Sequence, residues 1–330
     1  MRRATLALLC CPGCGASLTL AGDDAASAEI EEGWLACPPC GQRWPIERGI
    51  PRFVPRDGNY ADNFGVQWNL FRRLQLDSFS GQPISRDRFV NYTGWTDADL
   101  RDVLVLDAGC GAGRFAEVAL SFGARVIAID YSSAVDAARE NLKDRGDIDF
   151  IQADINALPF ARGAFPKVYC LGVIQHTPDP AASFEALAAL VAPGGGLAVD
   201  VYPAVWRNIF FAKYWIRPIT RRISPHRSLR IAHRIFPPLY GLSRLISRIP
   251  FAGRYLRYLI PVANYTNVYP LSRAQLREWA LLDTYDMWAP AYDKPQKLKT
   301  LAGWFAAAGF ANVETFRAGF FVGRGTKPAA

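Results

Sequence analysis

The chain has 330 residues, half of them hydrophobic, and a formal net charge of +8. This length allows a large buried core and predicts division into two domains. No run of about 18 uncharged apolar residues occurs, which argues against a transmembrane helix. The segment Met1 to Cys11 is similar to a signal peptide, but its apolar part is short and runs directly into a cysteine pair, so we do not expect secretion.

Two C-x-x-C pairs dominate the first 40 residues. Cys11 and Cys14 form the first pair, Cys37 and Cys40 form the second, 22 residues separate them, and a glycine follows each pair. Four thiolates at this spacing predict a tetrahedral structural zinc site in a small zinc ribbon. The glycines admit the tight turn that each pair requires.

The other cysteines leave two alternatives open. Cys10 adjoins Cys11 and can in principle replace it as a ligand, although the C-x-x-C spacing favours Cys11. The cysteines can also form disulfides, but isolated thiols at Cys110 and Cys170 suit a reducing cytoplasm better. We therefore expect a cytoplasmic protein with structural zinc.

A nucleoside-binding turn is predicted between Val103 and Phe115. The apolar run 103–106 is typical of a buried strand, and Gly109, Gly111 and Gly113 let the following backbone turn tightly and approach a ligand. Asp130 ends the next apolar run, where a carboxylate can accept hydrogen bonds from both ribose hydroxyls. Alone, these features also fit a dinucleotide-binding fingerprint.

Later elements favour a different cofactor. A predicted strand at 148–152 is followed by Asp154 and Ile155, which offer a carboxylate and an apolar wall to an adenine ring. A strand at 167–172, a helix at about 181–191 and a strand at 197–201 follow in order. This succession resembles the class I S-adenosylmethionine-dependent methyltransferases over residues 101–202 and again from about 297.

The resemblance implies an α/β fold, with a Rossmann-like seven-stranded sheet closed by a hairpin at 312–316 and 319–322. The N-terminal segment resembles the zinc ribbon fused ahead of many bacterial methyltransferases, a relative of the activator subunit of tRNA methyltransferases. We expect a ribbon at 1–55, a helical cover over the cofactor at 56–100, and a methyltransferase domain at 101–330. A basic helical lid is expected as an insertion at about 203–277.

The same resemblance implies the residues around S-adenosylmethionine. The methionine part is expected beside Asp107, Gly109 and Gly111, the ribose at Asp130, and the adenine at Asp154 and Ile155. Arg86 or Arg88 in the cover can pair with the methionine carboxylate, because a planar guanidinium suits that task. The full expected cofactor set is Asp107, Gly109, Cys110, Gly111, Gly113, Asp130, Tyr131, Asp154, Ile155, Gly172 and Arg88.

The acceptor is expected at the end of the strand 167–172. His176 lies there and can take a proton from an acceptor hydroxyl, or it only shapes the pocket. The segment 284–293 resembles one that borders the acceptor pocket in related bacterial enzymes. The acceptor-side candidates that it supplies are Tyr285, Asp286, Tyr292 and Asp293.

The insertion carries no Asp or Glu from Val201 to Arg277, but 14 Lys and Arg residues interleaved with apolar ones. The stretches 229–236 and 242–249 are predicted as short amphipathic helices. Such a region suits a lid on an anionic membrane or on a lipid-linked acceptor. It also suits RNA, or it is a cationic outer face that meets only solvent.

Our first interpretation is a methyltransferase that uses S-adenosylmethionine to O-methylate a small metabolite, a glycan or a lipid-linked intermediate, with peripheral membrane contact. The absence of Asn-Pro-Pro-Tyr or Asp-Pro-Pro-Tyr after residue 172 weighs against the amino-nitrogen methylases that carry it. The alternatives are an rRNA or tRNA methyltransferase that binds RNA through the ribbon and the insertion, and a catalytically dead cofactor-sensing or partner-binding protein.

Overall fold

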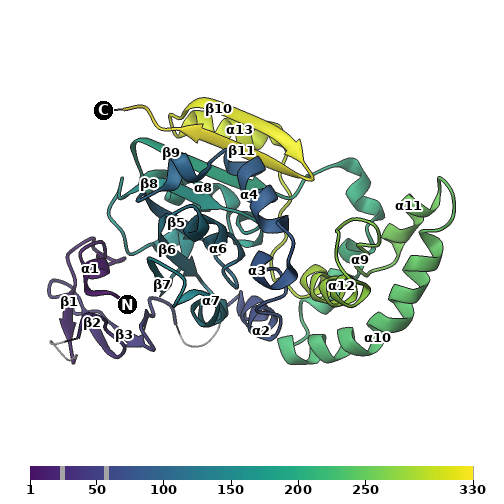
Figure 1. The fold of residues 1–330 in the computed structure, drawn as a ribbon, viewed down its shortest axis with the longest axis horizontal. Helices are drawn as coiled ribbons and strands as arrows, with labels where there is room; N and C mark the ends of the chain where they lie inside the picture. The colour runs from purple at the N-terminus through teal and green to yellow at the C-terminus, as the bar shows by residue number, and fades with distance from the viewer. Residues whose placement is uncertain (23–26, 56–58, 330) are drawn as a thin grey trace.

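The centre of the molecule is a seven-stranded mixed sheet, seen in the computed structural model of Figure 1, which describes residues 1–22, 27–55 and 59–329. The strand order is β10-β11-β9-β8-β5-β6-β7, and β11 runs antiparallel to both of its neighbours. The predicted fold class is confirmed. The strands are β5 (Leu104–Ala108), β6 (Arg125–Asp130), β7 (Ile148–Gln152), β8 (Phe165–Cys170), β9 (Val191–Val201), β10 (Ala311–Ala318) and β11 (Phe320–Thr326).

Apolar side chains on both sides of the central strands explain why this sheet is covered on both faces. Val105 and Val126 pack toward one face, whereas Leu106 and Ile127 pack toward the other. The first face is covered by α4 (Ile84–Thr93), α6 (Arg114–Ser121) and α7 (Ala134–Leu142). The second is covered by α8 (Pro180–Leu190) and α13 (Leu298–Ala307).

Strands β5, β6, β7, β8 and β9 are mutually parallel, so their carboxyl ends meet at one edge of the sheet. Ligands of open α/β sheets bind at this edge. Helix α2 (Asp62–Leu70) and Arg88 of α4 lie at this edge, whereas α5 (Asp97–Leu100) leads into the amino end of β5; α3 (Asp77–Ser80) lies between α2 and α4 in the chain. The expected boundary between residues 55 and 56 adjoins residues 56–58, which lie outside the described residues.

The N-terminal ribbon is a separate antiparallel sheet beside β7 (Figure 1). Its order is β1-β2-β3-β4, and the backbone N–H of Phe53 donates to the Gln152 carbonyl at 2.8 Å. Arg52 pairs with Asp136 of α7 at 2.7 Å, which fixes the ribbon against the central domain. Its elements are α1 (Arg3–Leu6), β1 (Thr19–Ala21), β2 (Gly33–Ala36), β3 (Arg43–Glu47) and β4 (Ile50–Pro51).

The insertion forms a helical layer on the far side of the molecule from the ribbon (Figure 1). One helix, α10 (Pro225–Ile246), contains all of the stretch 229–236 and residues 242–246 of the second stretch, so the prediction of two separate short helices was wrong. Buried positions at 228, 232, 236 and 240 recur every four residues, and packing of α10 on α12 stabilises an unbroken helix. The remaining elements are η3 (Trp206–Phe210), α9 (Ala212–Thr220), α11 (Gly253–Leu256), η4 (Arg257–Leu259) and α12 (Arg273–Trp288).

None of the helices in the described parts of the chain is both long and apolar enough to span a bilayer.

Candidate active site

A cavity of about 610 Å³ opens at the carboxyl ends of the parallel strands. Its walls come from the glycine turn after β5, the end of β8, helix α2 and the insertion. The cavity is therefore enclosed between the central sheet and the helical layer that the insertion adds. Its size matches that of pockets that bury a small-molecule ligand.

The glycine turn needs residues without a side chain. Gly109 and Gly111 have φ values of 81° and 54°, in the left-handed region that disfavours other residues. A Cβ at Gly109 would overlap Val173, and one at Gly111 would lie 3.2 Å from Trp68 Nε1. Gly113, by contrast, packs against Leu142 and does not line the cavity.

Asp130 lies in the cavity wall with its carboxylate already oriented. One oxygen accepts the Gly111 N–H at 2.9 Å, and the other accepts the Ser132 N–H at 2.8 Å and its hydroxyl at 2.7 Å. Burial raises the pKa of Asp130, while these hydrogen bonds act in the opposite direction. The network fixes the carboxylate beside the turn, where a ribose is expected.

The other predicted carboxylates at this edge do not line the cavity. Asp107 is buried and does not line the cavity, and burial raises its pKa to about 8, so it is mostly protonated near neutral pH. Its Oδ2 has no hydrogen-bond partner among the described residues. Asp154 caps η1 (Ile155–Ala157) by accepting the Asn156 N–H at 2.8 Å, whereas Ile155 itself reaches the cavity.

Tyr131 forms a planar aromatic wall together with Tyr60. Their ring centroids are 4.7 Å apart in a stacked arrangement, and both residues line the cavity. Cys110 and Gly172 also line it, so most of the expected cofactor set is brought together at one place. Asp107, Gly113 and Asp154 are the members that do not line the cavity.

The two candidate arginines of the helical cover differ in their position relative to the cavity. Arg88 lines the cavity, and its Nη2 pairs with Asp200 at 2.6 Å, where Asp200 also accepts the Gly172 N–H. Arg86 is exposed and stacks on Phe122, 4.8 Å from the ring centroid, away from the cavity. Of these two arginines, only Arg88 therefore lines the cavity, and its charge is already matched by Asp200.

His176 is buried in the cavity wall and held by the segment after the insertion. Its Nδ1 lies 2.9 Å from the Tyr292 carbonyl oxygen, which can only accept, so Nδ1 carries the proton. This leaves Nε2 as a proton acceptor. The rings of Tyr202 and Phe64 pack against the imidazole, with centroids 5.2 and 5.1 Å away.

Of the four acceptor-side candidates, only Asp286 lines the cavity, with Gln67 Nε2 3.5 Å from its Oδ1. Tyr285 is fully buried between helices, and its hydroxyl donates to the Pro225 carbonyl at 3.3 Å. Tyr292 contributes its carbonyl to His176. Asp293 forms ion pairs with Lys213 and Arg217 of α9 and so joins the insertion to the central domain.

Further cavity residues were not predicted from the sequence. They include Trp68, Arg114, Tyr202, Tyr269, Trp279 and Asp283. The position of Tyr202, directly after β9, is a signal that could have been used, because the carboxyl ends of parallel strands carry ligand contacts. For Trp279 and Asp283 there was no such signal, because only the packing of α12 brings them to the sheet.

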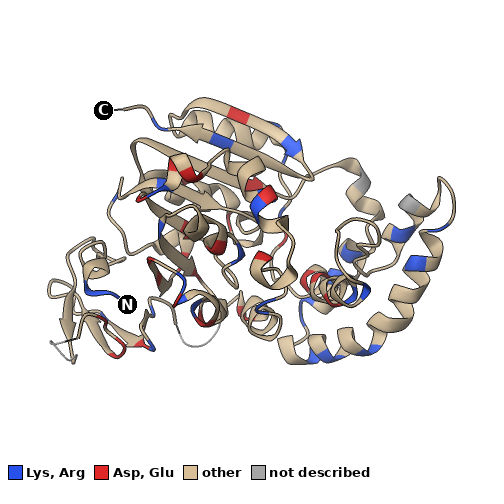
Figure 2. Ribbon diagram, viewed as in Figure 1, with Lys and Arg blue, Asp and Glu red and all other residues tan. Residues whose placement is uncertain are grey.

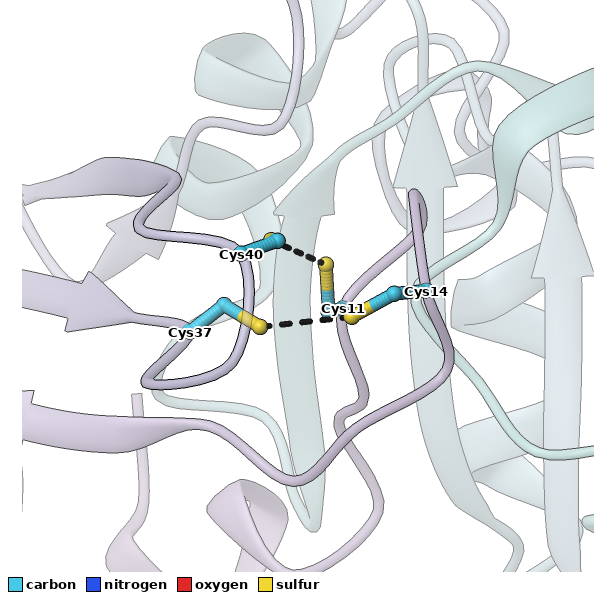
Figure 3. Close-up of side chains that lie close together, drawn as sticks. All are labelled: Cys11, Cys14, Cys37 and Cys40. Carbon is cyan, nitrogen blue, oxygen red and sulfur yellow. Dashed lines mark hydrogen bonds between the residues drawn. The ribbon is translucent and has the colours of Figure 1, made fainter.

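The four predicted cysteine ligands lie together at one end of the ribbon, and their side chains point toward one another (Figure 3). Their sulfur atoms all lie within 4.8 Å of one another, with Cys11 and Cys40 3.6 Å apart and Cys14 and Cys37 3.4 Å apart. Zinc–sulfur bonds of about 2.3 Å require a tetrahedral edge of about 3.8 Å, so the group fits zinc. Cys10 lies outside the cluster.

Two family comparisons bear on this arrangement. Residues 106–199 match the family described as Methyltransferase domain, and residues 2–49 match the family described as Trm112p-like protein. The chain carries a class I methyltransferase domain. A Trm112-like domain with four clustered cysteines precedes it, so the predicted family resemblance is confirmed.

Curated relatives of the methyltransferase domain cover part of the chain. The ubiquinone biosynthesis O-methyltransferase of Methylocella silvestris is 35% identical over 149 residues, which are 44% of this chain and 56% of the relative. The protein of the same name from Aromatoleum aromaticum is 41% identical over 125 residues, 36% of this chain and 53% of the relative. The chain thus spans about half the length of these relatives.

Solved structures are similar only at low identity. Magnesium protoporphyrin IX methyltransferase from Synechocystis PCC 6803 with bound SAH is 17% identical, with a TM-score of 0.37 over 70% of this chain and 76% of that one. A Haloferax volcanii complex that contains the Trm112 methyltransferase activator is 12% identical, with a TM-score of 0.44 over 81% and 98%.

Proposed function

We propose that the protein transfers the methyl group of S-adenosylmethionine to a hydroxyl of a small metabolite, a glycan or a lipid-linked intermediate. The observation that carries the proposal is that one cavity is lined both by the glycine turn with Asp130 and by His176. Asp130 accepts a hydrogen bond from the turn, and the Nε2 of His176 is left as a proton acceptor. Oxygen as the acceptor atom is further supported by the names of the curated relatives.

The residues around the glycine turn fit the cofactor. Asp130 would hold the ribose hydroxyls, Tyr131 and Ile155 would contact the adenine, and Gly109 and Gly111 would leave room for the methionine part next to the backbone. When bound, S-adenosylmethionine supplies an electrophilic methyl group on a sulfonium leaving group. The protein therefore mainly has to align the reactants, and alignment contributes as much as about 7–11 kcal/mol to catalysis.

His176 is the proposed general base. Its Nδ1–H is fixed by the Tyr292 carbonyl, so Nε2 takes the proton of the acceptor hydroxyl as the oxygen–methyl bond forms. Tyr202 and Phe64 hold the ring in this orientation.

Replacing Asp130 by alanine should strongly weaken cofactor binding. Each charge-assisted hydrogen bond to the ribose contributes about 1.5–3 kcal/mol, so the affinity should fall roughly 10- to 150-fold per bond. Titration calorimetry with S-adenosylhomocysteine measures this, with Asp144→Ala as a matched control at an exposed carboxylate. Unchanged affinity in a folded Asp130→Ala protein would reject the proposed cofactor site.

Replacing His176 by glutamine should lower kcat/KM by about 10²- to 10⁴-fold, because the general base is lost. The cofactor affinity of this variant should not change. His226→Gln, a control at an exposed histidine of α10, should leave the activity unchanged. An unaltered kcat/KM in the His176 variant would show that the residue only shapes the pocket.

The acceptor class is tested with radiolabelled S-adenosylmethionine and fractionated lipids, glycans and RNA. We expect label in the lipid, glycan or small-metabolite fractions. Label in RNA alone would support the RNA methyltransferase, which the acid-free basic insertion makes the second candidate. Cofactor binding with no labelled fraction would support the cofactor-sensing protein.

We also propose that the insertion lies on an anionic membrane surface. Figure 2 shows Lys and Arg residues along α10 and acidic residues only on α12 in this layer. Apolar side chains are exposed beside these cations, and Trp206 and Phe251 are 74% and 88% accessible. Exposed aromatic and cationic side chains together are typical of a helix that lies in the headgroup region.

A further inference from the structure

Arg114 is a cation in the cavity wall that forms no direct ion pair with any carboxylate of the described residues. It begins α6, directly after the glycine turn. Its Nε donates to the Ser85 hydroxyl at 3.2 Å and its Nη1 donates to Gln75 Oε1 at 2.5 Å, and both of these partners are neutral. Among the described residues, no carboxylate forms an ion pair with Arg114, and its Nη2 donates no hydrogen bond.

The nearest acidic side chains are occupied elsewhere. The Asp77 carboxylate accepts the N–H groups of Ser85 and Arg86, each at 2.8 Å. The Asp283 carboxylate accepts the Tyr265 hydroxyl, and burial raises the pKa of Asp283 to about 7. Neither carboxylate therefore neutralises Arg114 in the way that Asp200 neutralises Arg88.

The guanidinium is held in a fixed position. It lies over the rings of Phe115 and Trp279, at 4.8 and 5.7 Å from their centroids. Ser85, which is fully buried, is itself anchored by donating its hydroxyl to the Gln75 carbonyl at 2.8 Å. A rigid guanidinium fork with a free edge is suited to bidentate binding of a carboxylate.

Asp283 and Asp77 attract this charge only from a distance, and no carboxylate of the described residues touches it. Removing an ion from water is unfavourable unless a direct partner restores the lost interaction. Burial lowers the pKa of Arg114 to about 10, so the group still carries its charge at neutral pH. A ligand with a negative group would supply the missing partner.

We propose that Arg114 is the anion-recognising residue of the cavity and binds a ligand carboxylate through its free Nη2 edge. This inference rests on the proposed function, because the carboxylate belongs either to the methionine part of the cofactor or to the acceptor. The wall next to Arg114 is aromatic, with Tyr269 stacked on Trp279 at 5.0 Å. An acceptor that binds here is therefore expected to be a planar aromatic acid.

Two pairs of probes that differ only in a carboxylate test the proposal with the full-length protein. The acceptor pair is 4-hydroxybenzoate and phenol, and the cofactor pair is S-adenosylmethionine and its decarboxylated form. Calorimetry should show at least a tenfold preference of the unmodified protein for the acid in one pair. Arg114→Gln should remove that preference, and Arg114→Lys should retain part of it. Arg86→Gln, at an exposed arginine of α4, should leave it unchanged.

The pair that responds identifies the source of the carboxylate. Loss of preference in the cofactor pair assigns Arg114 to the methionine, and loss in the acceptor pair assigns it to the acceptor. No preference in the unmodified protein, or an unchanged preference in folded Arg114→Gln, overturns the proposal. Failure of the unmodified protein to bind S-adenosylmethionine at all instead contradicts the proposed function, while the benzoate arm still tests Arg114.

Discussion

Replacing Cys40 by serine should release one zinc ion per chain and unfold the N-terminal ribbon. Structural zinc contributes about 10–16 kcal/mol of apparent binding free energy, and a domain with so small a core folds poorly without its metal. The thiols of Cys11, Cys14 and Cys37 would remain, but three ligands leave the tetrahedral site open. Metal analysis and thermal unfolding of the purified protein measure both effects.

Cys10→Ser is the matched control, because this residue adjoins Cys11 but lies outside the sulfur cluster. It should keep one zinc ion and the unfolding temperature of the unmodified protein. Zinc retained in Cys40→Ser, or no zinc in the unmodified protein, would exclude the site. The ribbon also pairs with the central domain through Arg52 and Asp136, so its loss should lower the stability of that domain as well.

The sequence predicted the sheet because its strands are short apolar runs with clear ends. Ile148–Gln152 was predicted at the observed boundaries, and the predicted strand at 103–106 differs from β5 by one or two residues. The cysteine ligands were predictable for a similar reason, since their spacing is local. These features depend on the neighbouring residues in the chain, which a sequence displays directly.

The cavity depends on packing between distant segments, and there the sequence was less informative. Tyr285 and Asp286 are adjacent in the chain, yet the rotation of α12 buries the first and turns the second into the cavity. Arg114 meets Trp279 only because the packing of α12 brings that ring to the start of α6. Arg88 was proposed for its charge, but its pairing with Asp200 is visible only in three dimensions.

One helix face gives the proposed membrane contact a defined geometry. On α10 and just beyond it, exposed apolar side chains are spaced by about whole helical turns and so form one stripe along the helix. The exposed arginines have a similar spacing and form a second stripe next to it. The stripe and the buried face together leave the arginines on the outer edge. The exposed apolar residues are Ile231, Ile235, Leu242, Leu245 and Ile249. The exposed arginines beside them are Arg230, Arg234, Arg244 and Arg248.

Changing these four arginines together to glutamate should abolish binding to anionic vesicles. Each basic residue near such a surface contributes about 1 kcal/mol, so the loss is about 4 kcal/mol, or roughly a thousandfold in partitioning. Co-sedimentation with phosphatidylserine vesicles at two salt concentrations measures the effect. Binding by the unmodified protein should persist in moderate salt, because apolar burial is not screened.

A matched variant distinguishes the effect of charges on the insertion from the effect of the total net charge on vesicle binding. Four exposed cations outside the insertion, changed to glutamate, alter the net charge equally and should leave vesicle binding intact; they are Arg43, Lys143, Arg162 and Arg317. Cofactor affinity should survive in both variants, since none of these residues lines the cavity. Two results together would contradict the membrane proposal and indicate that the insertion binds RNA. They are absence of vesicle binding by the unmodified protein, and an RNA affinity that falls log-linearly with salt at a slope of about 0.7 per phosphate contacted.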